Sequence, residues 1–413
     1  MKSLALLFVP AIAFAQPAPR DEPAPAAPVP PAQEPAATQV PAPAPAPATP
    51  EPAPVVVTPS PAVEESPSMP RWADPAHHKL EVDFEMFGTA AFTHPGTGDN
   101  LSEFRLDRGE LGTVVGLGRS FGAELRLESV RSGAEGGALG IDGDSIVVRV
   151  KRAQAFGDFE REGLHLHGAL GVTPDPWIMA LETDYPLRPL SATASERVLG
   201  WPTSDLAALG RVAYGPVRFS VQFGNGEGLD YPERNTGKTT TGVIEALPLD
   251  TAAGRVRVMG VARDGSVGPA RVRDRRFGGA ATLWTPLISA GGELVKAYGI
   301  GDRGDLEALA LAGWAELRPH ALFALDGRFT TVGYADGGGR ASSIGGAVAV
   351  EPWRENKNRV HGHSRETDGV LRLWLALDRT TTSGGAMPIA GALSGDATTL
   401  LLIVSTTAPY TVD

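Results

Sequence analysis

The sequence predicts an all-β chain that folds as a transmembrane antiparallel β-barrel of about 16 strands. From residue 72 onward, apolar and polar residues alternate with a period of two, which is typical of strands with one apolar face. Short turns alternate with longer loops along the chain. After the first fifteen residues no apolar run of 18 or more residues occurs, so no transmembrane helix is expected.

Composition narrows the functional classes. The 413 residues contain no cysteine, which excludes a disulfide framework, and 50 glycines, which suits a chain rich in turns. The formal net charge of −11 argues against nucleic acid as a partner, because phosphate backbones require a basic face.

Residues 1–15 have the layout of a secretory signal peptide. Lys2 supplies a positive start, Leu4 to Phe14 form a short apolar core, and Ala13 to Ala15 provide a small-residue cleavage site. A buried N-terminal helix is the alternative, and the proline-rich sequence that follows disfavours it. We therefore expect an exported protein.

Residues 16–70 form a linker rich in proline and alanine. About half of the 36 prolines lie in this segment, as in PAPAPAPATP at 41–50. Proline lacks an amide donor and has a fixed φ, so we expect a disordered, extended linker in the periplasm. Contact with peptidoglycan and an unstructured leader without a partner are both compatible with this composition. The barrel is expected to occupy residues 71–413.

The first predicted strand shows the alternation most clearly. In KLEVDFEM at 79–86, Leu80, Val82 and Phe84 share one face, while Glu81 and Asp83 share the other. The same pattern recurs at 121–128, 148–151, 164–170, 217–223, 255–258, 323–330, 371–378 and 398–406. In each case the apolar face is expected to meet lipid and the charged face to meet the lumen.

Connection lengths distinguish a membrane barrel from a soluble β-sandwich, because membrane barrels alternate tight periplasmic turns with longer outer loops. Turns are expected at 118–120, 157–162, 215–216, 250–254, 285–287 and 318–320, with a longer one at 351–367. Loops are expected at 93–101, 132–145, 173–206, 225–241, 264–275, 299–305, 333–340 and 380–397. An even strand number returns both termini to the same side. Tyr214, Trp284, Trp314 and Trp353 lie beside short turns, where an interfacial aromatic girdle is expected.

Residues 164–228 carry a family resemblance. They hold the strand LHLHGALGV, a long loop with Glu196-Arg197 and Trp201-Pro202, and SDLAALGRVAYGPVRFSVQFGNGEG at 204–228. Together with Phe104-Arg105-Leu106, these motifs resemble the phosphate-selective porin O/P family. The resemblance implies a 16-stranded, usually trimeric barrel whose third outer loop folds inward to narrow the pore.

The third outer loop is also the longest by connection counting. Its charged residues are the candidate constriction residues Glu182, Asp184, Arg188, Glu196 and Arg197. This mixture lacks the dense lysine and arginine cluster of phosphate-selective members, so it does not indicate phosphate selectivity.

A barrel of this size encloses water, so inward charges should line a channel. The candidate pore-lining residues are Glu81, Asp83, Arg105, Glu124, Arg126, Arg149, Lys151, Arg218, Arg255, Arg257, Arg328 and Arg372. Rings of one charge sign bias permeation toward counter-ions. We expect either a transverse field between basic and acidic walls with weak anion preference, or charges that only solvate the lumen.

Enzymatic and metal-binding interpretations have weaker support. His165 with His167, and His361 with His363, have a spacing that can hold a metal, but such pairs are more often ordinary strand or turn residues. Asp142-Gly143-Asp144 lacks the ligand run of an EF-hand loop. No GxSxG, HExxH or phosphate-cradling lysine loop occurs. We expect no enzyme, no cofactor and no metal.

The sequence therefore predicts a bacterial outer-membrane porin that passes small polar or anionic solutes by diffusion. Its expected partner is outer-membrane lipid, and the family resemblance implies two further copies of the chain in a homotrimer. The alternative is a structural or adhesive barrel that is anchored to the cell wall through the Pro/Ala-rich segment. A barrel enzyme is a third class, which would require Ser, His and acidic residues from separate strands to meet at one rim.

Overall fold

A computed structural model describes residues 79–117, 120–131, 146–228, 236–251, 253–268, 271–300, 303–335, 338–355, 369–384 and 396–412. The expected signal peptide and linker, with their boundaries at residues 15 and 70, lie outside the described residues. Within these ranges the chain forms sixteen strands and two short helices. No helix in this part of the chain is long and apolar enough to cross a membrane.

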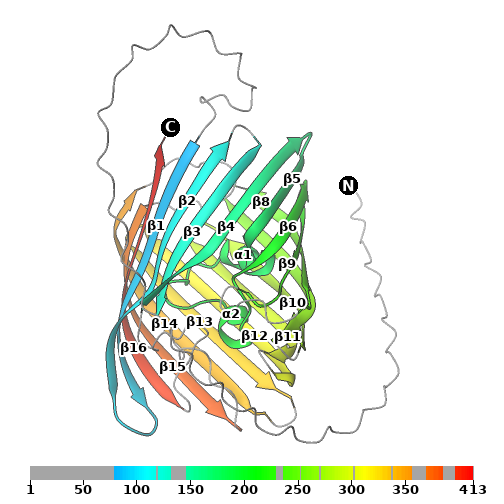
Figure 1. Ribbon diagram of the computed structural model, residues 1–413. Helices are drawn as coiled ribbons and strands as arrows, with labels where there is room; N and C mark the ends of the chain where they lie inside the picture. Colours follow the sequence, from blue (N-terminus) through cyan, green and yellow to red (C-terminus); the bar gives the residue numbers. More distant parts are fainter. Residues whose placement is uncertain are drawn as a thin grey trace, which may run out of the picture. The chain divides into compact units, whose positions relative to one another are not determined.

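The strands form one closed antiparallel barrel, as predicted (Figure 1). Each strand pairs with the next along the chain, and β16 closes the barrel against β1. Closure removes the unpaired edges that an open sheet would present. The strands are β1 (Lys79–Pro95), β2 (Leu101–Leu117), β3 (Phe121–Arg131), β4 (Ile146–Arg161), β5 (Leu164–Pro174), β6 (Ser204–Tyr214), β7 (Val217–Gly224), β8 (Thr239–Thr251), β9 (Gly254–Val267), β10 (Val272–Trp284), β11 (Ile288–Ile300), β12 (Arg303–His320), β13 (Phe323–Tyr334), β14 (Arg340–Glu355), β15 (Gly369–Ser383) and β16 (Ala397–Val412).

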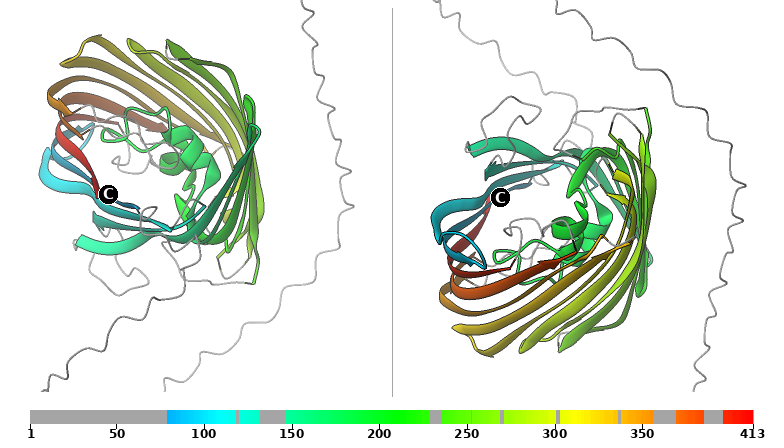
Figure 2. Two further views of the ribbon diagram at one scale, coloured as in Figure 1. Left: turned by 90° about the horizontal axis from the view of Figure 1, so that it is seen from above. Right: turned by 90° about the horizontal axis from the view of Figure 1, so that it is seen from below.

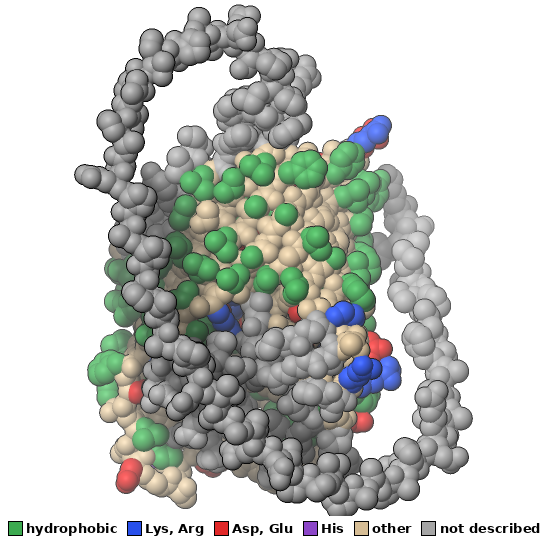
Figure 3. Space-filling model, in the orientation of Figure 1, with side chains coloured by type: hydrophobic (Ala, Val, Ile, Leu, Met, Phe, Trp, Pro, Cys, Tyr) green, Lys and Arg blue, Asp and Glu red, His purple; other side chains and the backbone are tan. Residues whose placement is uncertain are grey.

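The two faces of the barrel wall differ as the alternation predicts. On β7, Phe219 is 49% exposed, whereas its neighbours Ser220 and Gln222 are buried. Val217 and Leu373, whose direction tests the assignment of faces, are also exposed on the exterior. Apolar side chains are scattered over the part of the outer wall that is visible in Figure 3. A closed barrel with an apolar exterior is suited to a bilayer, because lipid offers backbone groups no hydrogen bonds.

Short turns and longer loops lie at opposite ends of the barrel. Gly215, at φ 55°, and Pro216 form the tight turn between β6 and β7. Two turns lie later in the chain than expected. β4 and β5 are joined at 162–163 because the strand pairing continues to Arg161, and β12 continues to His320 before its turn. Two further connections, 132–145 and 356–368, lie outside the described residues.

The third loop, residues 175–203, folds inside the barrel and holds both helices (Figure 2). The helices are α1 (Pro176–Glu182) and α2 (Ala194–Leu199). Asp175 caps α1 by accepting hydrogen bonds from the Trp177 and Ile178 amides. Thr193 and Glu196 form a reciprocal capping box on α2, and Gly200 ends it in the left-handed conformation. Local sequence therefore sets where both helices begin.

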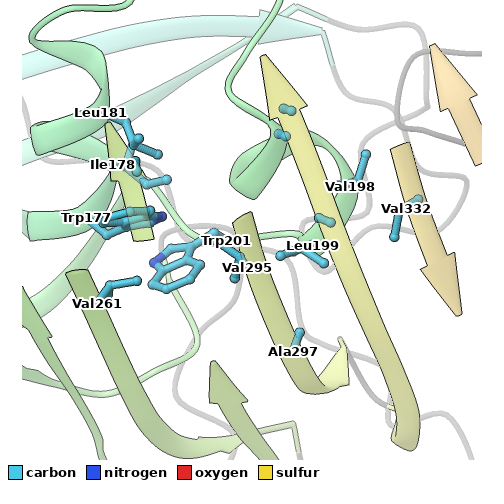
Figure 4. Close-up of a cluster of buried hydrophobic side chains, with 14 of the residues drawn as sticks. Trp177, Ile178, Leu181, Val198, Leu199, Trp201, Val261, Val295, Ala297 and Val332 are labelled. Carbon is cyan, nitrogen blue, oxygen red and sulfur yellow. The ribbon is translucent and has the colours of Figure 1, made fainter. Parts of the chain in front are cut away.

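The apolar faces of these helices pack on the interior of strands β8–β14. Trp177, Leu181, Leu199 and Trp201 are fully or almost fully buried there. Figure 4 shows Trp177 and Trp201 side by side, with Val261 and Val295 of the barrel wall close to them. Burying about five large apolar side chains at roughly 1.5–3 kcal/mol each strongly favours the inward position of the loop.

Part of the expected aromatic girdle is wrong. Tyr214 is exposed at the end of β6, as a girdle residue should be. Trp314 instead points inward and meets the ring of Tyr185 edge-on at 5.0 Å. Trp284 lies on the same face of β10 as buried Thr282, so it is also interior. Trp353 lies among residues whose side chains are not described. Proximity to a turn did not identify the face, which strand parity decides.

Candidate functional site: a loop-narrowed lumen

The inward fold of the third loop is held by polar anchors as well as by its apolar core. The carboxylate of Glu293 on β11 accepts hydrogen bonds from the amides of Ala194 (2.7 Å) and Ser195 (3.3 Å) and from the Ser195 hydroxyl (2.5 Å). The Trp177 indole donates to the same hydroxyl at 2.9 Å. These bonds fix both helices to one strand of the barrel.

A second set of anchors holds the middle of the loop. Asp184 accepts a hydrogen bond from Thr282 at 2.7 Å and lies 3.3 Å from both Arg255 and Arg257. Arg257 also donates to the carbonyl of Ala180 at 3.1 Å. The third loop is therefore cross-linked to β9 and β10 by charge-assisted hydrogen bonds, which are stronger than neutral ones.

Two arginines anchor the returning arm of the loop to β13. Arg328 donates to the carbonyl of Leu190 at 3.2 Å and pairs with Asp378 at 2.9 Å. Arg197 donates to Thr330 at 2.9 Å. Burial, together with the neighbouring charge of Arg328, lowers the pKa of Arg197 to about 10. Arg197 remains charged at neutral pH.

The polar edge of the loop carries Glu182, Arg188 and Glu196. Arg188 forms ion pairs with both glutamates, and Glu196 also accepts hydrogen bonds from the amide and hydroxyl of Thr193. Burial by itself would raise the pKa of Glu196, but Arg188, Arg108 and the Thr193 bonds outweigh it and hold that pKa below the ordinary value. The edge thus carries fixed charges of both signs.

A dense charge network covers the interior of strands β1–β4. Arg126 forms two hydrogen bonds with Asp83, at 2.7 and 2.8 Å, and also pairs with Glu110. Lys151 pairs with Glu110 and lies 3.5 Å from Glu128. The network also includes Arg108 with Glu110 and Glu128, Arg149 with Glu128, and Arg152 with Glu124.

The loop edge and this network face each other. Arg188 lies close enough to Glu110 and Lys151 to interact electrostatically with both. Glu196 interacts in the same way with Arg108. Since the apolar side of the loop covers β8–β14, these charged groups of the loop and of β1–β4 face each other across the rest of the lumen.

A smaller set of charges lies near the short-turn end of β12–β15. Arg372 pairs with Glu316 at 2.9 Å and also with Glu351, and Arg318 pairs with Glu351 at 3.0 Å. Glu316 and Arg318 also line a chamber of about 550 Å³ below the third loop, together with Asp184, Tyr185 and Trp284. The chamber opens near the β10–β11 turn, so it lies between the loop and that end of the barrel.

The structure places the predicted lumen residues on the interior face. They are Glu81, Asp83, Arg105, Glu124, Arg126, Arg149, Lys151, Arg218, Arg255, Arg257, Arg328 and Arg372. Their surroundings differ. Arg255, Arg257 and Arg328 anchor the loop, Arg372 belongs to the β12–β15 set, and Asp83, Glu124, Arg126, Arg149 and Lys151 lie in the β1–β4 network. Their role in conduction stays a prediction.

The expected basic and acidic walls are not separate. In the β1–β4 network each cation lies beside a carboxylate on its own or an adjacent strand, and Arg126 and Lys151 also pair with a carboxylate two strands away. Pairing across neighbouring strands brings opposite charges together, because cross-strand partners lie closer than residues on opposite walls. The charges on β1–β4 are therefore mixed, and whether the lumen as a whole carries a transverse field stays a prediction.

Sequence reasoning missed Arg108 and Glu110 as interior residues. Counted in steps of two from interior Arg105, both would fall on the exterior face. A register shift where Phe87 pairs with Arg108 and Gly88 with Leu106 adds one residue to β2 and reverses the parity. Glu293 was also missed. The sequence signal that could have identified Glu293 is that it is a lone acidic residue on the strand face that also carries Val295 and Ala297.

The histidine pairs do not form a metal site in the described residues. His167 and His165 approach one carboxylate, Asp158, at 3.0 and 3.5 Å. Throughout the described ranges, no group of three or more His, Asp or Glu residues is arranged to hold a metal ion. His361 and His363, and Asp142 to Asp144, lie outside those ranges.

Comparison with solved structures finds the same fold. The anion-selective porin from Comamonas acidovorans matches with a TM-score of 0.52 and 13% identity over 80% of this chain and 100% of that one. OmpT, an outer membrane protein of Vibrio cholerae, matches with a TM-score of 0.51 and 10% identity over 79% of this chain and 97% of that one. A trimer form of OmpT gives a TM-score of 0.50 and 11% identity, covering 79% and 99%. The chain therefore shares the barrel fold of these outer-membrane proteins.

No protein-family model and no curated protein matches the sequence.

Proposed function

We propose that this protein is a bacterial outer-membrane porin whose third loop narrows a water-filled channel for small polar or anionic solutes. The observation that carries this proposal is the one-sided packing of the loop. Its apolar face is buried against β8–β14, while Glu182, Arg188 and Glu196 face the charged interior of β1–β4.

The paired charges support the proposed solute class. Water and small polar solutes can exchange hydrogen bonds with carboxylates and guanidinium groups at such a constriction, whereas apolar solutes cannot. Anions are included because the wall that faces the loop carries guanidinium and ammonium groups as well as carboxylates. The mixed charge supports general diffusion better than a dedicated phosphate site.

Membership of the phosphate-selective porin O/P family is part of the proposal. It rests on the motifs in residues 164–228 and on the inward third loop between β5 and β6. We also propose a homotrimer in outer-membrane lipid, with the Pro/Ala-rich segment in the periplasm, where it would reach peptidoglycan. The proposal includes no catalytic step.

Planar-bilayer recording of the refolded full chain tests the proposal. Reproducible open steps are expected, and the reversal potential in a salt gradient gives the ion preference. Arg188→Gln removes the cation from the loop edge and should shift the reversal potential toward cations. Arg161→Gln is the matched control, because Arg161 is 73% exposed in the β4–β5 turn, away from the loop.

If both variants conduct and Arg188→Gln shows the same reversal potential as Arg161→Gln, the edge of the third loop does not form the constriction. Silence from a correctly folded, heat-modifiable barrel would contradict the porin proposal. In that case the structural or adhesive barrel, anchored through the Pro/Ala-rich segment, would be the better explanation.

A further inference from the structure

A compact set of charged side chains lies on the exterior wall at the long-loop end of β9–β12. It is called here the exterior charged patch and consists of Asp264, Arg273, Arg275, Lys296, Tyr298 and Glu307. Arg273 is 60% exposed and Lys296 45% exposed, so both are open to the surroundings of the barrel. None of these residues lines the lumen.

The strand register brings the patch together. Arg275 pairs with Asp264 on one side and with Tyr298 on the other, and Tyr298 pairs with Glu307. These four residues therefore form one row across four strands. Lys296 lies on the same face one step below this row, and Arg273 lies one step above it. A single headgroup could touch cations on two adjacent strands.

Apolar side chains adjoin the patch on the side of the barrel's middle. Phe277 and Leu309 are exposed on the exterior and flank Lys296 as its cross-strand partners, and exposed Leu294 lies one step nearer the middle. Charges in the hydrocarbon region are costly, by about 2–4 kcal/mol at the midplane of a barrel. The change from apolar to charged residues therefore marks the boundary between acyl chains and headgroups on this side of the barrel.

Internal pairing leaves donors available in the patch. Asp264 accepts two hydrogen bonds from Arg273, at 3.0 and 3.1 Å, whereas Arg275 lies 3.6 Å from the same carboxylate. Lys296 is 3.3 Å from Glu307 and 4.5 Å from the centre of the Tyr298 ring. The three cations exceed the two carboxylates by one charge, and a planar guanidinium and an ammonium are suited to phosphate oxygens.

We propose that the exterior charged patch binds the phosphate group of a phosphorylated, acylated lipid of the outer leaflet. Arg275 and Lys296 hold the phosphate, Arg273 supports it from above, and the acyl chains lie along Phe277, Leu294 and Leu309. Tyr298 lies at the interface, where aromatic rings with a polar tip are favoured. This inference shares only the membrane setting with the proposed function, and its assay needs no conductance.

Native mass spectrometry of the full chain in detergent, titrated with diphosphoryl lipid A, tests the proposal. Cations near a membrane surface contribute enough for about a fivefold change in affinity each, so Arg275→Gln with Lys296→Gln should weaken binding roughly 25-fold. Arg379→Gln is the matched control, because Arg379 is exposed at the long-loop end of β15, three strands away from the patch strands β9–β12. It should leave binding unchanged.

Further arms of the titration separate the sources of the phosphate. Lipid A stripped of its phosphates should bind as weakly to the parent as diphosphoryl lipid A binds to the double variant. Inorganic phosphate at millimolar concentration should not displace the lipid, because it lacks the acyl contacts. Displacement by inorganic phosphate alone would make the patch an anion site and would overturn the lipid assignment.

Two other outcomes would also overturn the proposal. One is equal lipid binding by the double variant and Arg379→Gln, with heat-modifiability showing that both are folded. The other is a change in oligomeric state of the double variant without a loss of lipid binding, which would make the patch a contact between subunits.

Discussion

Removing the Glu293 carboxylate should free α2 from the barrel wall. Glu293 is buried and accepts three hydrogen bonds from Ala194 and Ser195. Hydrogen bonds to a charged group contribute about 1.5–3 kcal/mol each, but the desolvation of a buried carboxylate offsets part of that sum. We expect Glu293→Ala to weaken the anchoring of α2 by about 2–4 kcal/mol.

The assay is single-channel recording of the refolded variant. The Asp184 and Arg328 anchors and the apolar core remain, so the loop should leave the wall intermittently instead of permanently. Open-channel noise and mean conductance should therefore both rise. The strand pairing does not involve the Glu293 side chain, so the heat-modifiability of the barrel should stay unchanged.

Two further single variants are measured: Glu307→Gln as the control and Glu293→Gln as the conservative replacement. Glu307 lies on the exterior of the adjacent strand β12, so it loses the same charge without touching the loop. Glu293→Gln keeps an amide oxygen as acceptor and should give an intermediate phenotype. If folded Glu293→Ala shows the conductance and noise of the parent, the carboxylate does not hold the loop and the anchoring argument is wrong.

Three further predictions follow from the same structure. Trp177→Ala replaces a fully buried ring by a cavity and removes the hydrogen bond to Ser195, so the loop packing should weaken by about 3–5 kcal/mol. Proteolysis within residues 175–203 should therefore be faster than in the control Thr183→Ala, whose side chain lies at the exposed end of α1. Val258→Arg places a charge on the exterior of β9, where Val258 is 50% exposed. The barrel should lose roughly 2–4 kcal/mol of stability in lipid. If this variant is as stable as Arg379→Ala, the assignment of the exterior face is wrong. The pKa of Glu196 lies below its ordinary value in the folded loop. The ionised Glu196 therefore contributes fully to loop stability above the ordinary glutamate pKa, and this contribution is lost as pH falls through the lowered pKa. Conductance noise should rise only under acidic conditions below the usual glutamate range, and an identical acid response in Glu196→Gln would assign that response to another group.

The sequence by itself determined the barrel and most of its wall. Alternation with a period of two assigned residues such as Val217, Leu373 and Arg126 to the correct face, because each strand meets a different medium on each side. Glycine, proline and aspartate between the strands marked the connections, and these gave the strand number and the length of the third loop. Both depend on local chemistry, which a single sequence contains.

Only the tertiary structure decided what the lumen contains. The inward position of the third loop depends on apolar contacts between its helices and seven strands that follow it in the chain, from β8 to β14. Trp314 was therefore assigned to the membrane interface, although it packs on Tyr185. No local pattern records such contacts, because they join residues that are far apart in the sequence, such as Ala180 and Arg257 or Leu190 and Arg328.

The charge pairing has the same origin. A single register shift between β1 and β2 turns Arg108 and Glu110 inward, where they meet Glu128 and Lys151 of two other strands. The composition of the interior could be listed from the sequence, but which charges neutralise each other could not. Register and closure choose those partners, and both are properties of the assembled barrel.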